Sequence, residues 1–178
     1  MRKFFTLVTL LALSACTPAS EEANPLREKL RGTDLTSLAY QSISGDETTL
    51  KSLHNGKPVL VNYWATWCVP CVLELPSLKR LEDQGKFQVI TVSFDNDPAV
   101  VENFLQDKKL SNLTVLFDRG GATTAQKLGV SGVPTTLILD QQLVLQGLEE
   151  GGREWDHAAT IAKIYEDLRQ PAQPKGNN

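Results

Sequence analysis

Residues 59–71 have the sequence VLVNYWATWCVPC, in which a nearly continuous apolar run leads directly into Cys68 and Cys71. Such a run predicts a strand buried on both faces of a mixed or parallel sheet. Apolar residues then recur at three-residue spacing, which predicts an amphipathic helix over residues 69–83. Cysteines three residues apart share one helical turn and can form a disulfide, and the first lies where backbone N–H groups stabilise a thiolate. The stretch therefore predicts a redox-active dithiol.

Other uses of a Cys-x-x-Cys pair fit this sequence poorly. Covalent haem attachment requires a histidine directly after the second cysteine, where the chain has Val72. A structural zinc site requires four ligands, and the remaining candidates, Cys16, His54 and His157, are widely scattered. A purely structural crosslink would close so small a loop that its entropic contribution is near the minimum. We therefore expect neither a metal nor a cofactor.

The composition is that of a single acidic domain. The chain has 178 residues, is 41% hydrophobic and carries a formal net charge of -3. This apolar content can fill one core, and nothing basic favours nucleic acid as a partner. Only the motif cysteines lie in the fold region, so the core must supply the stability. We expect a monomer.

The N-terminus predicts export from the cytoplasm. A basic start precedes residues 4–13, an apolar stretch well short of the about 20 residues that span a bilayer. Residues 13–16, LSAC, resemble the bacterial lipobox, in which the signal is cut before a cysteine that carries lipid. We therefore predict a signal peptide over residues 1–15 and lipidation of Cys16, with a soluble secreted form or an uncleaved anchor as alternatives. Thr17 slightly favours the outer over the inner membrane.

The remaining chain predicts one α/β domain with polar ends. We expect a flexible tether over residues 16–33, the folded domain over 34–169 and a polar tail over 170–178. A short hairpin is predicted over residues 35–40 and 47–50, around a Gly-Asp turn. Further strands are expected at 58–64, 87–94, 114–118, 135–140 and 143–148, and further helices at 98–108, 122–128 and 154–168. Pro76 should bend the helix that begins at the cysteines.

The block at residues 59–71, followed by Glu74-Leu75-Pro76 and later by residues 132–140, GVPTTLILD, resembles the thioredoxin superfamily. Within this superfamily, the chain resembles the branch of TlpA/ResA-like extracytoplasmic thiol:disulfide oxidoreductases. The resemblance covers about residues 34–168 and implies a thioredoxin-like fold, in which a central mixed β-sheet is flanked by helices. It also implies an N-terminal hairpin, a central βα insertion that includes residues 98–108, and a cis peptide bond at Val133-Pro134 that faces the cysteines.

The resemblance assigns roles around the motif. Cys68, at the helix start, would attack the client disulfide, and Cys71, one turn inside, would resolve the mixed disulfide. Val133 and Pro134 would present backbone groups to an extended substrate strand. Trp67 would shape the same docking surface, although plain hydrophobic packing explains this residue equally well.

Glu74 is a candidate proton acceptor, because ResA-like proteins carry a glutamate at this position. A solvated glutamate on the helix surface is the alternative. Many thioredoxins have a buried aspartate where this chain has Asn62, and asparagine cannot ionise. This difference places more of the proton transfer on Glu74 or on water.

The predicted function is a periplasm-facing thiol:disulfide oxidoreductase that reduces exported proteins. By resemblance, its clients would be apocytochrome c or assembly factors for the copper centre of oxidases, and its electron donor a membrane protein of the DsbD/CcdA type. A disulfide oxidase is the first alternative, because sequence does not fix the reduction potential. A copper-binding chaperone on the same fold is the second, because two thiolates can hold Cu(I).

Overall fold

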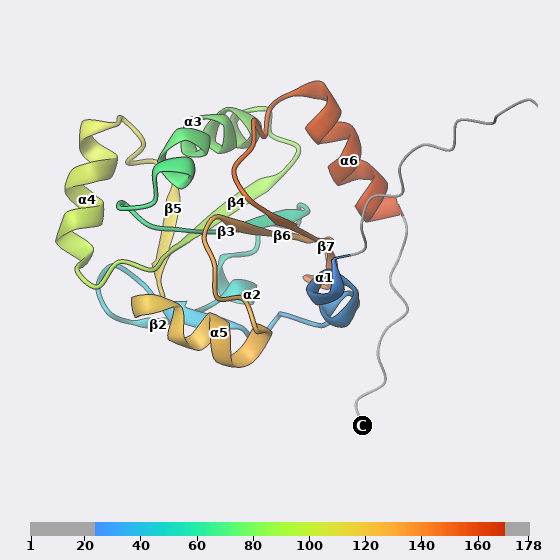
Figure 1. Ribbon diagram of the computed structural model, residues 1–178, viewed down its shortest axis with the longest axis horizontal. Helices are drawn as coiled ribbons and strands as arrows, with labels where there is room; N and C mark the ends of the chain where they lie inside the picture. The colour runs from blue at the N-terminus through green and yellow to red at the C-terminus, as the bar shows by residue number, and fades with distance from the viewer. Residues whose placement is uncertain (1–23, 170–178) are drawn as a thin grey trace, which may run out of the picture.

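The computed structural model describes residues 24–169 and has a seven-stranded mixed sheet with helices on both faces (Figure 1). The strand order is β2-β1-β5-β4-β3-β6-β7. The central strands β3 (Val59–Trp64), β4 (Gln88–Ser93) and β5 (Thr114–Phe117) run parallel. Strands β6 (Thr135–Leu139) and β7 (Leu145–Glu150) extend the sheet beyond β3 in antiparallel pairs. This architecture confirms the expected α/β, thioredoxin-like fold.

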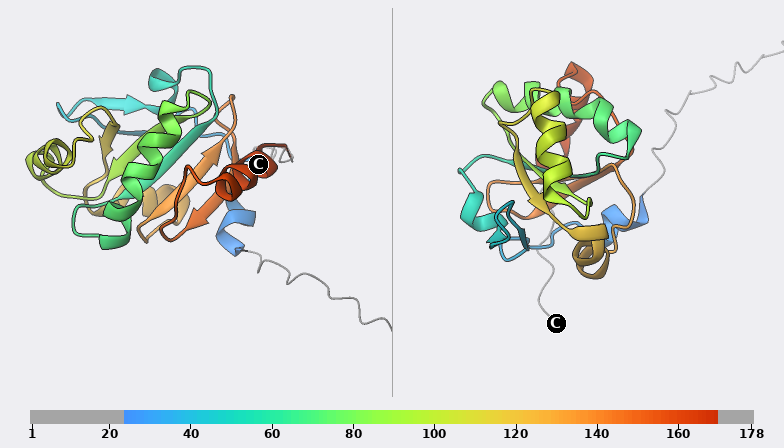
Figure 2. Two further views of the ribbon diagram at one scale, coloured as in Figure 1. Left: turned by 90° about the horizontal axis from the view of Figure 1, so that it is seen from above. Right: turned by 90° about the vertical axis from the view of Figure 1, so that its left-hand side faces the viewer.

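Helices on both faces explain the continuous apolar run in the central strands. Helices α3 (Val69–Asp83) and α6 (Ala158–Arg169) cover one face, and α1 (Pro25–Leu30) and α5 (Ala122–Leu128) cover the other (Figures 1 and 2). Every residue of β3 and β4 is buried. The predicted central helix is α4 (Pro98–Asp107), which connects β4 to β5. A strand enclosed in this way gains from apolar side chains that point in either direction.

The N-terminal hairpin is shorter than predicted. It consists of β1 (Ala39–Gln41) and β2 (Glu47–Thr49), and β1 also pairs antiparallel with β5. The second strand ends at Thr49 because the Thr49 hydroxyl accepts a hydrogen bond from the Ser52 N–H and caps α2 (Leu50–Leu53). The remaining element between β5 and α5 is a single 3₁₀ turn, η1 (Arg119–Gly121).

The predicted tether is wrong for the part that the structure describes. Asn24 caps α1, with Pro25 in the first turn, and Leu30 is buried against the domain. Leu26 and Leu30 are four residues apart and therefore share one face of the helix. The Arg27 guanidinium donates a hydrogen bond to the buried carboxylate of Asp167 on α6. A short apolar face and the ion pairs of Arg27 with Asp167 and Glu149 thus hold a segment whose average composition is polar.

The terminal helix begins later than predicted, at Ala158 instead of residue 154. The preceding loop turns back onto α3, where the Trp155 N–H donates to the Ser77 hydroxyl over 2.9 Å. Trp155 is fully buried. The helix therefore begins only after the residues that make this contact with α3. The predicted signal peptide, Cys16 and the C-terminal tail lie outside the described residues.

Candidate active site

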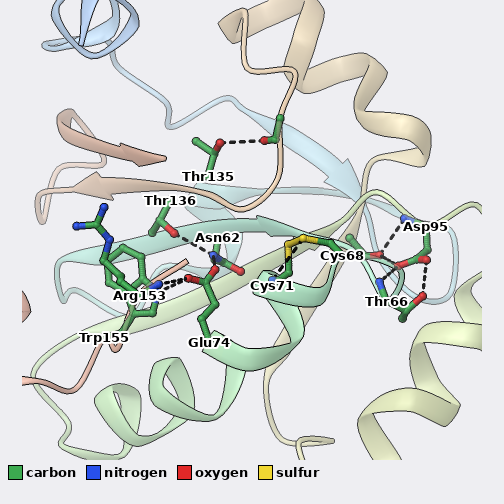
Figure 3. Close-up of a disulfide and its surroundings, with 12 residues drawn as sticks. Asn62, Thr66, Cys68, Cys71, Glu74, Asp95, Thr135, Thr136, Arg153 and Trp155 are labelled. Carbon is green, nitrogen blue, oxygen red and sulfur yellow. Dashed lines mark hydrogen bonds between the residues drawn. A yellow bond between two sulfur atoms is a disulfide. The ribbon is translucent and has the colours of Figure 1, made fainter. Parts of the chain in front are cut away.

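The two cysteines lie where β3 ends and α3 begins. Cys68 is the N-cap of α3, and its Sγ accepts a hydrogen bond from the Cys71 N–H over 3.4 Å. The structure shows them joined as a disulfide, with an S–S distance of 2.09 Å (Figure 3). Cys68 keeps 6% of its surface exposed, whereas Cys71 is fully buried in the first turn. The backbone N–H groups at the start of α3 therefore favour a thiolate on Cys68, the accessible member of the pair.

Trp67 and Val69 flank Cys68 in the chain, and Leu73 lies one helical turn after Val69 on α3. Trp67, Val69 and Leu73 expose 66%, 69% and 70% of their surfaces. Trp67 therefore does not pack in the core, which removes the simple packing explanation of this residue. Large exposed apolar groups that lie together typically mark a binding surface.

The Val133-Pro134 peptide bond is cis, as predicted. Strand β6 runs antiparallel to β3, with Thr135 opposite Tyr63. Pro134 therefore lies at the end of β3 from which the chain enters the cysteine loop. Residues 132–134 and the cysteine pair therefore lie at the same end of strands β3 and β6.

Glu74 points into the protein and not into solvent, so the alternative of a solvated surface glutamate is wrong. Its side chain is 2% exposed, and its two carboxylate oxygens accept three hydrogen bonds (Figure 3). The donors are Asn62 Nδ2 at 2.8 Å, Trp155 Nε1 at 2.9 Å and the Arg153 backbone N–H at 3.1 Å.

Burial is the main influence on the pKa of the Glu74 carboxyl. Loss of hydration raises the pKa of the Glu74 carboxyl above its ordinary value of 4.5, and the hydrogen bonds from Trp155, Asn62 and Arg153 offset part of that rise. A surface hollow of about 250 Å³ adjoins this glutamate and is lined by Pro70, Leu73, Glu74, Gly152, Arg153 and Glu154. Glu74 thus combines a raised pKa with a route to solvent, as a proton acceptor requires.

A second polar cluster near Cys68 escaped the sequence analysis. Asp95 is buried and accepts hydrogen bonds from the Thr66 N–H at 2.9 Å, the Thr66 hydroxyl at 2.7 Å and the Ser93 hydroxyl at 2.8 Å. Parallel pairing of β3 with β4 aligns Trp64 with Ser93, so the residues that follow both strands meet. The sequence does carry a signal for this cluster, because Thr66 and Asp95 are polar residues that follow the buried strands β3 and β4. Asp95 fixes the loop that leads into Cys68.

A model of the Redoxin family matches residues 31–168. The chain belongs to the Redoxin family. It is 31% identical over 125 residues to the thioredoxin-like protein YneN of Bacillus subtilis, covering 67% of this chain and 71% of the relative. It is also 28% identical over 146 residues to the thiol-disulfide oxidoreductase ResA of Bacillus cereus, covering 79% of this chain and 83% of ResA.

Solved structures agree with this membership. The crystal structure of a candidate thiol:disulfide interchange protein DsbE from Chlorobium tepidum has a TM-score of 0.65 at 27% identity, covering 78% of this chain and 97% of that one. StoA from Bacillus subtilis shares the fold, with a TM-score of 0.56 at 20% identity and coverage of 72% and 95%. With the Cys-x-x-Cys pair at the helix start, this Redoxin chain is a thioredoxin-like thiol:disulfide oxidoreductase.

The burial of Glu74 makes the stability of this Redoxin protein depend on pH. Below pH 4.5, Glu74 is protonated in both the folded and unfolded chains. As pH rises, the unfolded chain releases this proton first, so the free energy of unfolding falls until pH passes the raised folded pKa. We therefore predict that this fall is absent in Glu74→Gln.

Urea unfolding of the oxidised protein, from below pH 4.5 to neutral pH, measures this difference. Glu102→Gln is the matched control, because Glu102 is exposed on α4; it should follow the wild type throughout. Parallel pH profiles for wild type and Glu74→Gln would show that Glu74 ionises as readily in the folded protein as in the unfolded chain.

Proposed function

We propose that this protein reduces disulfides in exported proteins, with Cys68 as the attacking thiolate and Cys71 as the resolving thiol. The difference in exposure between the two cysteines carries the proposal: Cys68 caps the helix and keeps 6% of its surface exposed, whereas Cys71 is fully buried in the first turn. An incoming disulfide can reach Cys68, whereas the buried Cys71 can reach only the sulfur of Cys68.

The first step transfers the client to the protein. The Cys68 thiolate attacks one sulfur of the client disulfide, whose S–S bond breaks as the Cys68–client bond forms. The displaced client sulfur leaves as a thiolate and takes a proton from water. The positive end of the helix dipole, at the start of α3, favours the thiolate that this step requires.

The second step releases the client. Cys71 loses its proton and attacks Cys68 Sγ, which forms the Cys68–Cys71 disulfide and expels the second client sulfur as a thiolate that also takes a proton from water. The client gains two electrons and two protons in all. We assign Glu74 as acceptor of the Cys71 proton, because its buried carboxylate lies three residues further along α3 and adjoins the surface hollow.

The client would bind beside the cysteines as an extended strand. Pro134 has no N–H, so the backbone groups of Val133 are left to pair with such a strand. The exposed Trp67 would cover apolar client side chains. Apocytochrome c and assembly factors for oxidase copper centres are the proposed clients, and a membrane protein of the DsbD/CcdA type is the proposed electron donor.

Localisation follows from the N-terminal sequence. We propose cleavage before Cys16, lipidation of this cysteine and display of the domain on the periplasmic side of a bacterial membrane. Within residues 24–169, no helix has the length and apolar character needed to cross a bilayer. In this proposal the lipid supplies the attachment, and several acyl chains make it stable.

Trapping of clients tests the reductive direction. In Cys71→Ser, Cys68 can still attack a client disulfide, but no second thiol resolves the product, so covalent complexes should accumulate. An oxidase would need the intact Cys68–Cys71 disulfide to begin, and this variant cannot form it. Complexes are captured from the cell envelope, separated without reductant and identified by mass spectrometry.

Cys68→Ser is the control, because it leaves only the buried thiol. It should capture few or no clients. Equal capture by the two variants would contradict the assigned roles, and absence of complexes with Cys71→Ser would contradict the reductive direction. Cytochrome or oxidase-assembly proteins among the captured clients would support the proposed assembly function.

Membrane attachment provides a separate test. We predict that Cys16→Ser moves the protein from the membrane to the soluble fraction or leaves the signal uncleaved, because the lipid acceptor is lost. Fractionation followed by mass analysis of the N-terminal peptide measures both results. Normal processing with unchanged membrane association would remove the lipid-anchor proposal.

A further inference from the structure

The amide of Asn62 has a fixed orientation. Its Nδ2 donates one hydrogen bond to Glu74 Oε1 over 2.8 Å and the other to Thr136 Oγ1 over 2.9 Å. Rotation of the amide would place its oxygen against the Glu74 carboxylate, where two acceptors would repel each other. Nδ2 therefore belongs on the side of Glu74, and both of its hydrogens are used.

The oxygen of the same amide has no such partner. Asn62 is fully buried, and Oδ1 has no hydrogen-bond partner within residues 24–169. A buried carbonyl oxygen without a donor is unfavourable and therefore calls for an explanation. Figure 3 shows the Asn62 side chain between Glu74 and Cys71, with its oxygen turned toward Cys71.

Cys71 can supply the absent donor only in one redox state. In the disulfide its sulfur carries no hydrogen, and this is the state that the structure shows. Reduction gives Cys71 an S–H group, which is a weak hydrogen-bond donor. Cys71 is itself fully buried, so water does not compete for this hydrogen.

We propose that Asn62 Oδ1 accepts a hydrogen bond from the Cys71 S–H of the reduced protein. Asn62 is then a positioning residue for the resolving thiol: it holds Cys71 protonated at the buried end of the pair until the mixed disulfide forms. Because the hydrogen bond exists only after reduction, it stabilises the dithiol relative to the disulfide.

The same side chain connects the thiol to Glu74. One end of the Asn62 amide holds the proton donor of the second step, and the other end holds the proposed acceptor. An aspartate here would add a second negative charge beside Glu74, which would oppose ionisation of both carboxyls. Asparagine supplies the oxygen toward Cys71 without that charge.

The redox equilibrium with glutathione gives the first test. Asn62→Leu removes the unpaired oxygen from the oxidised protein and the acceptor from the reduced protein. Its loss of the Glu74 contact affects both states and largely cancels. We expect the equilibrium constant for reduction by glutathione to fall by about two- to tenfold, the range for a single hydrogen bond.

Thr136→Val is the matched control. It removes another hydrogen bond of Asn62 but leaves Oδ1 and Cys71 in place, so the equilibrium constant should remain within about twofold of the wild type, below the smallest loss assigned to a hydrogen bond. An unchanged constant in Asn62→Leu would overturn the proposal, as would an equal fall in both variants.

Infrared spectroscopy tests the hydrogen bond itself. In the full chain carrying Cys16→Ser and Cys68→Ser, only Cys71 bears a thiol, and its S–H stretching band should lie at lower wavenumber than that of a thiol without an acceptor. Adding Asn62→Leu should raise the wavenumber, whereas adding Asn62→Asp, which retains an oxygen there, should keep it low. A band already at the unbonded position would overturn the proposal even if Asn62→Leu fails to fold.

The proposal rests on the exchange chemistry of the cysteine pair and is independent of its direction and clients. Failure of the wild-type protein to equilibrate with glutathione would contradict the proposed function, whatever the state of Asn62. A normal wild-type equilibrium with an unbonded S–H would contradict only the role of Asn62.

Discussion

The burial of the Glu74 carboxylate is the constraint on which the site depends. Three elements converge on it: Asn62 from β3, Glu74 from α3, and the loop that carries Arg153 and Trp155 toward α6. A buried carboxylate requires such donors, because unpaired it would be strongly unfavourable. The donors only partly offset the cost of burial, and the raised pKa of Glu74 is the consequence. The same contacts therefore join the C-terminal loop to α3 and prepare the acid for proton transfer.

The unequal cysteines follow from their places at the start of α3. A residue at the N-cap lies outside the helix and faces the free N–H groups, whereas a residue three positions later turns inward against the sheet. Asp95 and Thr66 fix the approach to Cys68 from one side, and Asn62 and Glu74 surround the inner part of the turn from the other. The site thus separates an accessible nucleophile from a sheltered resolving group and its proton acceptor.

Local sequence patterns predicted most helices and strands. Features that depend on contacts between residues far apart in the chain could not be predicted. The helix over residues 69–83 and the strand that ends at Trp64 have the predicted bounds at the motif, because periodicity and capping are local properties. The burial of Glu74 could not be decided from sequence, since Trp155 is about eighty residues away along the chain. Helix α1 was missed because the contact of Arg27 with Asp167 joins residues 140 positions apart in the chain. Asp95 was missed because strand pairing, and not sequence spacing, brings it to Thr66.

Direct titration of Glu74 tests the account most closely. Carbon-13 NMR of the glutamate side-chain carboxyls, with Glu74→Gln to assign the resonance, measures the pKa of Glu74 in the oxidised and reduced proteins. We predict a pKa above 4.5 in the oxidised protein and a different value after reduction, because Cys71 then carries an S–H group beside the same amide. A pKa of 4.5 that is the same in both redox states would show that Glu74 is neither effectively desolvated nor coupled to the resolving cysteine.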